Sequence, residues 1–175
     1  SEKDESARDI EEKLERHLRK SDESRRRNEK RIKEHRDRSD ESRKKFETDL
    51  KRIEDEVRKR GPNRDELDEL LKRLKDELDD HRRRTEKSAR ESKKHLDEHR
   101  KRTEDSLRTF EEELKKLEPD EKLKDLERKV REVIDRDRDI LRRLEEEHRK
   151  VITEDEEILK RLEEKAREAI ERIRR

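Results

Sequence analysis

The chain has 175 residues, of which 65% are charged and 21% hydrophobic, and its 57 Lys and Arg nearly balance 56 Asp and Glu to give a net charge of +1. This balance, with two phenylalanines as the aromatic residues, argues against a nucleic-acid-binding groove. No apolar stretch approaches the roughly 18 residues of a membrane span, the N-terminal SEKDESARDI lacks the apolar segment of a signal peptide, and cysteine is absent. We therefore expect a soluble protein that binds neither nucleic acid nor membranes.

Interleaved charges and the scarcity of Gly and Pro favour long helices. Gly61-Pro62 is a helix stop, and Asn63 with an acidic residue three positions later resembles a capping box. Pro119 suits the first turn of another helix. The expected helices span about residues 4–60, 64–117 and 119–174.

A polar motif recurs four times on the first two predicted helices: a histidine, a Ser or Thr four residues later, and a Ser three residues after that. The copies are His17-Ser21-Ser24, His35-Ser39-Ser42, His81-Thr85-Ser88 and His99-Thr103-Ser106. On each helix the second copy follows the first by 18 residues, about five helical turns, and so returns to the same face. Steps of three and four residues keep each copy on the face that otherwise carries Leu and Ile. The sequence therefore predicts a polar core with a translational repeat.

The third predicted helix has the same repeat, because residues 133–150 align with residues 151–168. Its apolar residues come in adjacent pairs and form a stripe wide enough to face two helices. Two positions on this stripe are acidic, Asp137 and Asp155. The predicted fold is all-α: a long, nearly straight antiparallel three-helix bundle, in which the third helix lies in the groove of a helical hairpin.

The short loops predict the register, because short connections make neighbouring helices antiparallel. Facing residue numbers should total about 124 across the first loop and about 240 across the second. The predicted His–Ser pairs are Ser24–His99, His17–Ser106, Ser42–His81 and His35–Ser88. The predicted acidic layers are Ser21 with Thr103 and Asp137, and Ser39 with Thr85 and Asp155. Two equivalent polar modules result, and their residues form the expected structural polar network.

Two further polar residues are expected in the core. Asn28 is interpreted either as a network member or as a separate polar layer that sets the register. His148 is interpreted as a core histidine rather than a ligand.

These motifs, the two acidic positions, the short loops and the Glu/Lys/Arg surface resemble de novo designed helical bundles with buried hydrogen-bond networks. The resemblance covers all 175 residues, although the polar seam is longer than in most such bundles. It implies a protein without an evolved activity, built as a test of core design or as an assembly component. We expect a monomer, and the alternative is a subunit of a designed hetero- or homo-oligomer that responds to pH.

Two patterns raise the question of an enzyme. Ser, His and Asp together resemble a hydrolase triad, but straight helices offer neither a nucleophile elbow nor an oxyanion hole. His95-Leu96-Asp97-Glu98-His99 fits the H-x-x-E-H zinc pattern, a match that arises readily by chance in a Glu-rich chain. We therefore expect no catalysis, and no metal, cofactor or small-molecule ligand.

Overall fold

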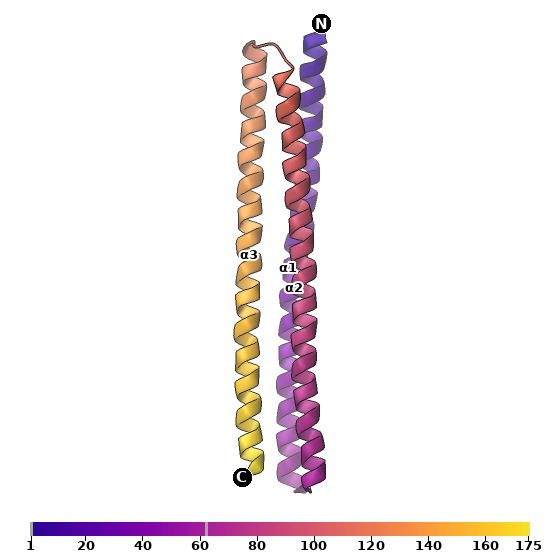
Figure 1. Cartoon of the computed structure of the whole chain (residues 1–175), viewed down its shortest axis with the longest axis vertical. Helices are drawn as coiled ribbons and strands as arrows, with labels where there is room; N and C mark the ends of the chain where they lie inside the picture. The colour runs from indigo at the N-terminus through magenta and orange to yellow at the C-terminus, as the bar shows by residue number, and fades with distance from the viewer. Residues whose placement is uncertain (1, 62) are drawn as a thin grey trace. The chain divides into compact units, whose positions relative to one another are not determined.

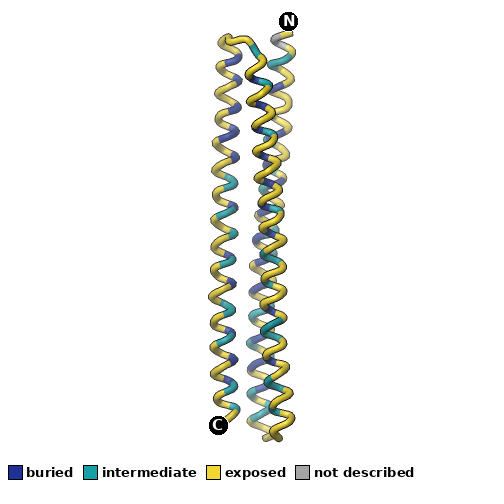
Figure 2. The backbone as a smooth tube through the Cα atoms, in the orientation of Figure 1, coloured by how far each residue is buried: buried dark blue, intermediate teal, exposed yellow. Residues whose placement is uncertain are grey.

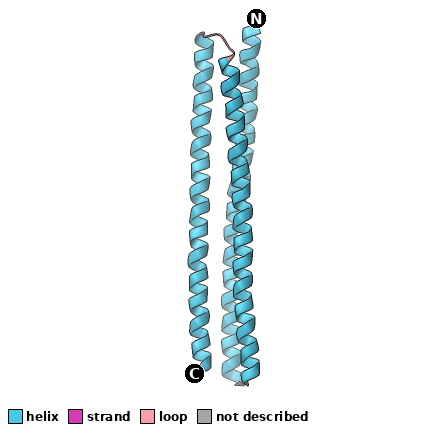
Figure 3. Ribbon diagram, in the orientation of Figure 1, coloured by secondary structure: helices cyan, strands magenta, loops and turns pink. Residues whose placement is uncertain are grey.

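The computed structural model describes residues 2–61 and 63–175 and contains three long helices (Figure 1). They are α1 (Glu2–Arg60), α2 (Arg64–Lys115) and α3 (Glu121–Arg174). Within the described residues no β-strand is found, and loops separate the helices (Figure 3). The predicted all-α fold is therefore confirmed, and α1 begins two residues earlier than expected.

The predicted stop and start signals act at the junction of α1 and α2. Gly61 has a φ of +52°, and its N–H donates to the Val57 carbonyl oxygen at 3.1 Å. This is the left-handed helix end that glycine tolerates without a side-chain clash. Asn63 Oδ1 accepts the Glu66 N–H at 2.9 Å and so caps α2. The helix-breaking role predicted for Pro62 lies outside the described residues.

Helix α2 ends at Lys115 rather than at Leu117. The N–H groups of Lys116 and Leu117 donate to the carbonyl oxygens of Glu113 and Leu114, at 3.2 and 3.1 Å. These bonds reach back three residues instead of four, so the last turn tightens into a 3₁₀-like geometry. The predicted boundary was therefore two residues too long.

Helix α3 begins at Glu121, not at Pro119. Asp120 is the capping residue, because its Oδ1 accepts the Leu123 N–H at 2.7 Å. Pro119 consequently precedes the cap and does not occupy the first turn, as the sequence had suggested. An acidic cap satisfies a free N–H group and also complements the positive end of the helix dipole.

The chain divides into two compact units, each built from segments of all three helices. The first unit comprises Ser1–Arg31 and Ser92–His148, and the second comprises Ile32–Glu91 and Arg149–Arg175. Each helix runs without a break from one unit into the other, and each unit has its own apolar cluster.

In the first unit α1 runs antiparallel to α2 and parallel to α3. Lys13 pairs with Glu113 on α2, while Lys129 on α3 pairs with Glu11. The apolar cluster of this unit draws residues from all three helices. Its buried members are Ile10, Leu14, Leu107, Phe110, Leu114, Leu123, Leu126, Val130, Val133 and Ile134.

The second unit repeats this arrangement around Phe46. Its buried apolar residues are Phe46, Leu50, Ile53, Leu74, Leu162, Ala166 and Ala169, with Leu70, Leu78, Ile158 and Ile173 packed against them. In the tube view of Figure 2, buried and half-buried positions recur at intervals along each helix. Among the described residues no large hydrophobic side chain is exposed, and none of the helices is long and apolar enough to cross a membrane.

Candidate functional site

The first unit contains a buried carboxylate, Asp137, which is 2% exposed. Its Oδ2 lies 2.6 Å from His17 Nε2, and its Oδ1 accepts the Ser21 hydroxyl hydrogen at 2.9 Å. Because an ionised carboxylate can only accept, the hydrogen of the His17–Asp137 bond belongs to the imidazole Nε2. The His17 ring also meets Phe110 edge-on, with a centroid distance of 5.6 Å and an interplanar angle of 87°. One aspartate of α3 thus binds two side chains of α1.

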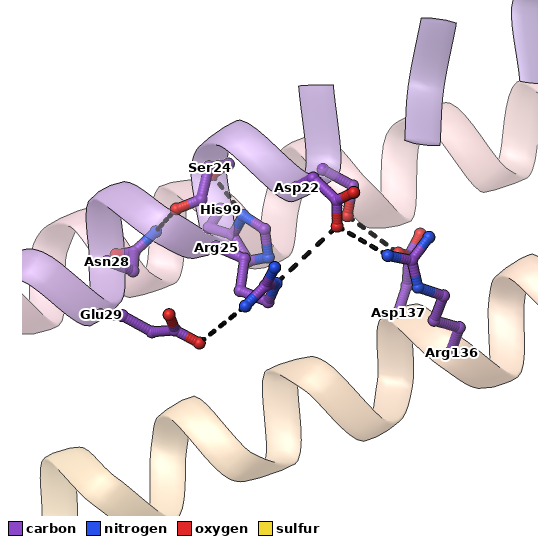
Figure 4. A network of polar contacts seen from close by, with 9 residues as sticks. Asp22, Ser24, Arg25, Asn28, Glu29, His99, Arg136 and Asp137 are labelled. Carbon is purple, nitrogen blue, oxygen red and sulfur yellow. Dashed lines mark hydrogen bonds and ion pairs between the residues drawn. The ribbon is translucent and has the colours of Figure 1, made fainter. Parts of the chain in front are cut away.

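A second polar contact joins α1 to α2 in the same unit. Ser24 Oγ lies 2.5 Å from His99 Nδ1, and both residues are buried. These two residues are the pair that the loop register had placed opposite each other. Asn28, 3% exposed, donates from Nδ2 to the Ser24 carbonyl oxygen at 2.9 Å, within its own helix (Figure 4). The backbone of Ser24 therefore connects Asn28 to this contact.

Burial controls the protonation of His99. The pKa of His99 is lowered, first because burial disfavours the imidazolium, and the nearby negative charge of Asp137 opposes this shift. Electrostatic interactions with Arg102, His17 and Arg27 lower the pKa of His99 further. The contact with Ser24 is therefore one between a neutral imidazole and a hydroxyl at neutral pH.

The second unit repeats the acidic contact with the same geometry. His35 Nε2 lies 2.6 Å from Asp155 Oδ2, and Ser39 Oγ donates to Asp155 Oδ1 at 2.7 Å. In both units the bonded His and Asp are 120 residues apart, and the bonded Ser and Asp are 116 apart. The 18-residue sequence repeat thus becomes a repeat of atomic contacts.

Two further Ser–His contacts lie in the second unit. Ser42 Oγ is 2.5 Å from His81 Nδ1, and Ser88 Oγ is 2.6 Å from His35 Nδ1. His81 is 2% exposed, and its Nε2 is buried without a hydrogen-bond partner. The pKa of His81 is lowered by burial and then by the positive charge of Arg84, while Asp155 opposes the shift.

Each of the two predicted acidic layers differs from the structure in one member. Thr103 is buried and Thr85 half-buried, but among the described residues neither side chain hydrogen-bonds to an aspartate. His17 and His35 take that place, so α1 supplies both hydrogen-bond partners of each aspartate. Ser106 is half-buried, and His17 bonds to Asp137 instead of to Ser106.

The sequence held a signal for the His–Asp contacts. His17 precedes Asp137 by the same 120 residues that separate His35 from Asp155. The loop register relates α1 to α2 and α2 to α3, whereas these bonds join α1 to α3, which no loop connects directly. Comparing the two repeats across α1 and α3 would have indicated the contacts.

Ion pairs on the surface follow the same α1–α3 register. Lys129–Glu11, Lys165–Glu47 and Arg172–Glu54 each join residues 118 apart. In Figure 4 the pair of Arg136 with Asp22 lies beside Asp137. Such exposed pairs contribute little stability individually, so their value here is as markers of register.

The two histidines of the zinc-like pattern have different contacts. His99 faces Ser24, whereas His95 is half-buried and its Nδ1 lies 3.6 Å from Glu98 Oε2 on the same helix. Among the described residues no group of three or more His, Cys, Asp or Glu could hold a metal ion. His148 is half-buried in the first unit, which also contains the buried Ser92.

No protein-family model and no curated protein matches this chain. A solved structure described as a computationally designed three-helix bundle matches it with a TM-score of 0.57 over 99% of this chain and 83% of the other. The chain has the fold of a three-helix bundle. Since the two sequences are 15% identical, the likeness concerns the fold alone. The two buried His–Ser–Asp modules are the candidate functional sites of this bundle.

Proposed function

We propose that the chain is a de novo designed structural scaffold whose core is specified by its repeated buried hydrogen-bond networks, and that it has no natural enzymatic activity. The observation that carries this proposal is the repeated contact of Asp137 with His17 and Ser21, and of Asp155 with His35 and Ser39. The likeness to a designed bundle and the lack of a matching natural family support it.

The networks would act by penalising wrong registers. A slip of one helical turn moves a side chain by about 5.4 Å, whereas the carboxylate contacts span 2.6 to 2.9 Å. The slipped state would bury carboxylates without partners, which is costly. A core of leucines lacks this penalty, because apolar contacts of similar quality re-form after a slip. A slip of 18 residues would align one polar repeat with the other and restore partners, but the short loops between the helices prevent a slip of that length.

Residues 1–175 are further proposed to fold as a single domain. The uninterrupted passage of α1, α2 and α3 from one unit into the other supports this, because unfolding one unit would fray all three helices. A single calorimetric transition with equal van't Hoff and calorimetric enthalpies is expected. Two resolved transitions would contradict the single domain without affecting the network proposal.

A second candidate function is that of a subunit in a designed homo- or hetero-oligomer that responds to pH. The half-buried Ser42, Thr85 and Ser88 favour it, because they line a cavity of about 430 Å³ in the second unit, where the polar network is not fully enclosed. Light scattering distinguishes the two candidates. A mass near 21.8 kDa supports the monomeric scaffold, and an integral multiple supports the oligomer.

A further inference from the structure

The second module contains a continuous relay of three side chains. Ser88 Oγ lies 2.6 Å from His35 Nδ1, and His35 Nε2 lies 2.6 Å from Asp155 Oδ2. Asp155 also accepts the Ser39 hydrogen, so both of its oxygens are occupied as acceptors. The Nε2 hydrogen of His35 is therefore directed to the carboxylate, and in the neutral ring Nδ1 is left to accept the Ser88 hydrogen.

This connectivity is that of a nucleophile, a general base and an orienting acid. The roles of the two ring nitrogens are exchanged relative to serine proteases, in which Nδ1 faces the aspartate and Nε2 the serine. The exchange does not change the chemistry, because either imidazole nitrogen can take up a proton.

The relay opens onto space that a small ligand could enter. His35 and Ser88 both line the cavity of about 430 Å³, which is in the size range of small-molecule pockets. Its charged lining residues are Arg38, Lys45, Arg84 and Lys87 together with Glu41 and Glu91, so cations outnumber carboxylates. Asp155 is not among the lining residues, so the acid lies behind the histidine as seen from the cavity.

We infer that Ser88 is a reactive nucleophile toward small activated carboxylic esters, with His35 as its general base and Asp155 as the residue that orients the base. Ser88 Oγ bonds to the ester carbonyl carbon while its proton passes to His35 Nδ1. The tetrahedral intermediate then collapses with cleavage of the bond to the leaving alcohol, which takes up the proton. Water then bonds to the acyl carbon while one of its protons passes to the same nitrogen, and that proton returns to Ser88 Oγ as the acyl–serine bond breaks and the carboxylic acid is released. This activity goes beyond the scaffold role and does not depend on it.

The bundle offers two internal comparisons for Ser88. Ser42 lines the same cavity and also contacts a histidine, but His81 has no acid on its other nitrogen and its pKa is lowered by burial, which weakens it as a base. Ser106 is the counterpart of Ser88 in the first unit, where His17 bonds to Asp137 and not to the serine. If the relay activates Ser88, neither of these serines should match its reactivity.

The expected reactivity is modest. General-base assistance contributes about 10²- to 10⁴-fold, and the cavity supplies flexible cations instead of fixed donors for the oxyanion. Because fixed oxyanion donors are missing from this lining, we expect Ser88 to be acylated about 10- to 100-fold faster than Ser42 or Ser106, which is at or below the lower limit of that range.

The test treats the full chain with p-nitrophenyl acetate, follows nitrophenolate release, and maps the acetyl groups by peptide mass spectrometry. We expect the fastest labelling at Ser88, its loss in Ser88→Ala, and unchanged labelling of Ser88 in the matched control Ser106→Ala. His35→Gln should slow acylation of Ser88 at least tenfold. If circular dichroism shows that His35→Gln does not fold, the site map of the unaltered chain and the Ser88→Ala variant decide.

Two results would overturn the inference. One is acetylation confined to lysines, histidines or the chain's amino terminus. The other is similar labelling of Ser88, Ser42 and Ser106, which would mean that the relay confers no activation.

Discussion

Replacing Ser21 with alanine removes one of the two hydrogen bonds that the buried Asp137 carboxylate accepts. The serine is 6% exposed and the aspartate 2% exposed, so water cannot easily restore the lost bond. A hydrogen bond to a charged group contributes about 1.5 to 3 kcal/mol, and we expect the free energy of unfolding to fall by that amount. For a chain of this size the melting temperature should fall by about 3 to 12 °C.

The matched variants are Ser39→Ala, which removes the equivalent bond to Asp155, and Ser106→Ala, which removes a half-buried hydroxyl that is not bonded to a histidine. Urea denaturation should give similar losses for Ser21→Ala and Ser39→Ala, with unchanged m-values, and a change within about 0.5 kcal/mol for Ser106→Ala. The two network serines share no bonding partner, so their effects should add. Equal losses for Ser21→Ala and Ser106→Ala would refute the reasoning, since the buried carboxylate would then gain nothing specific from its serine.

Three other outcomes are expected. The double variant Asp137→Leu/Asp155→Leu loses two hydrogen-bond acceptors, but it also loses two charges that are costly to bury, so its denaturation midpoint should change little. Its unfolding transition should broaden or its mass in solution should change. A sharp two-state monomer would argue against the role of the aspartates in specificity. Because burial lowers the pKa of His81 and His99, the unfolded chain binds more protons than the folded chain below pH about 6.5. Their contribution to stability is therefore fully present above that pH and is lost as the pH falls toward 5, and His81→Gln/His99→Gln should flatten the dependence of the midpoint on pH. Gly61→Ala should destabilise the chain by about 1 kcal/mol, because a φ of +52° is unfavourable for alanine. An added Cβ would meet nothing within 4 Å, so no steric clash adds to this cost. An unchanged denaturation midpoint would mean that the α1–α2 junction adopts another backbone conformation.

The local features of the bundle were predictable because their causes are local. Gly61 and Asn63 end and start helices through bonds to residues three or four positions away. The Ser24–His99 and Ser42–His81 contacts could also be predicted from the sequence, since a short loop fixes how two neighbouring helices align. Where the boundaries were wrong, as at Pro119, a capping side chain outweighed the general preference of proline for the first turn.

The partners of the aspartates were decided by tertiary structure. The sequence by itself determined three helices, the faces that carry polar residues, and the 18-residue interval at which the polar pattern returns. It did not determine whether Asp137 would bind Thr103 on α2 or His17 on α1, because both helices present polar groups to α3 and no loop joins α1 to α3. The packing of the helices decided that competition: α1 brings both the His17 imidazole, at 2.6 Å, and the short Ser21 hydroxyl, at 2.9 Å, to the Asp137 carboxylate, whereas Thr103 on α2 forms no bond to it. The same choice, repeated at His35 and Asp155, brought Ser88 into line with a histidine and an acid that lie far from it in the sequence.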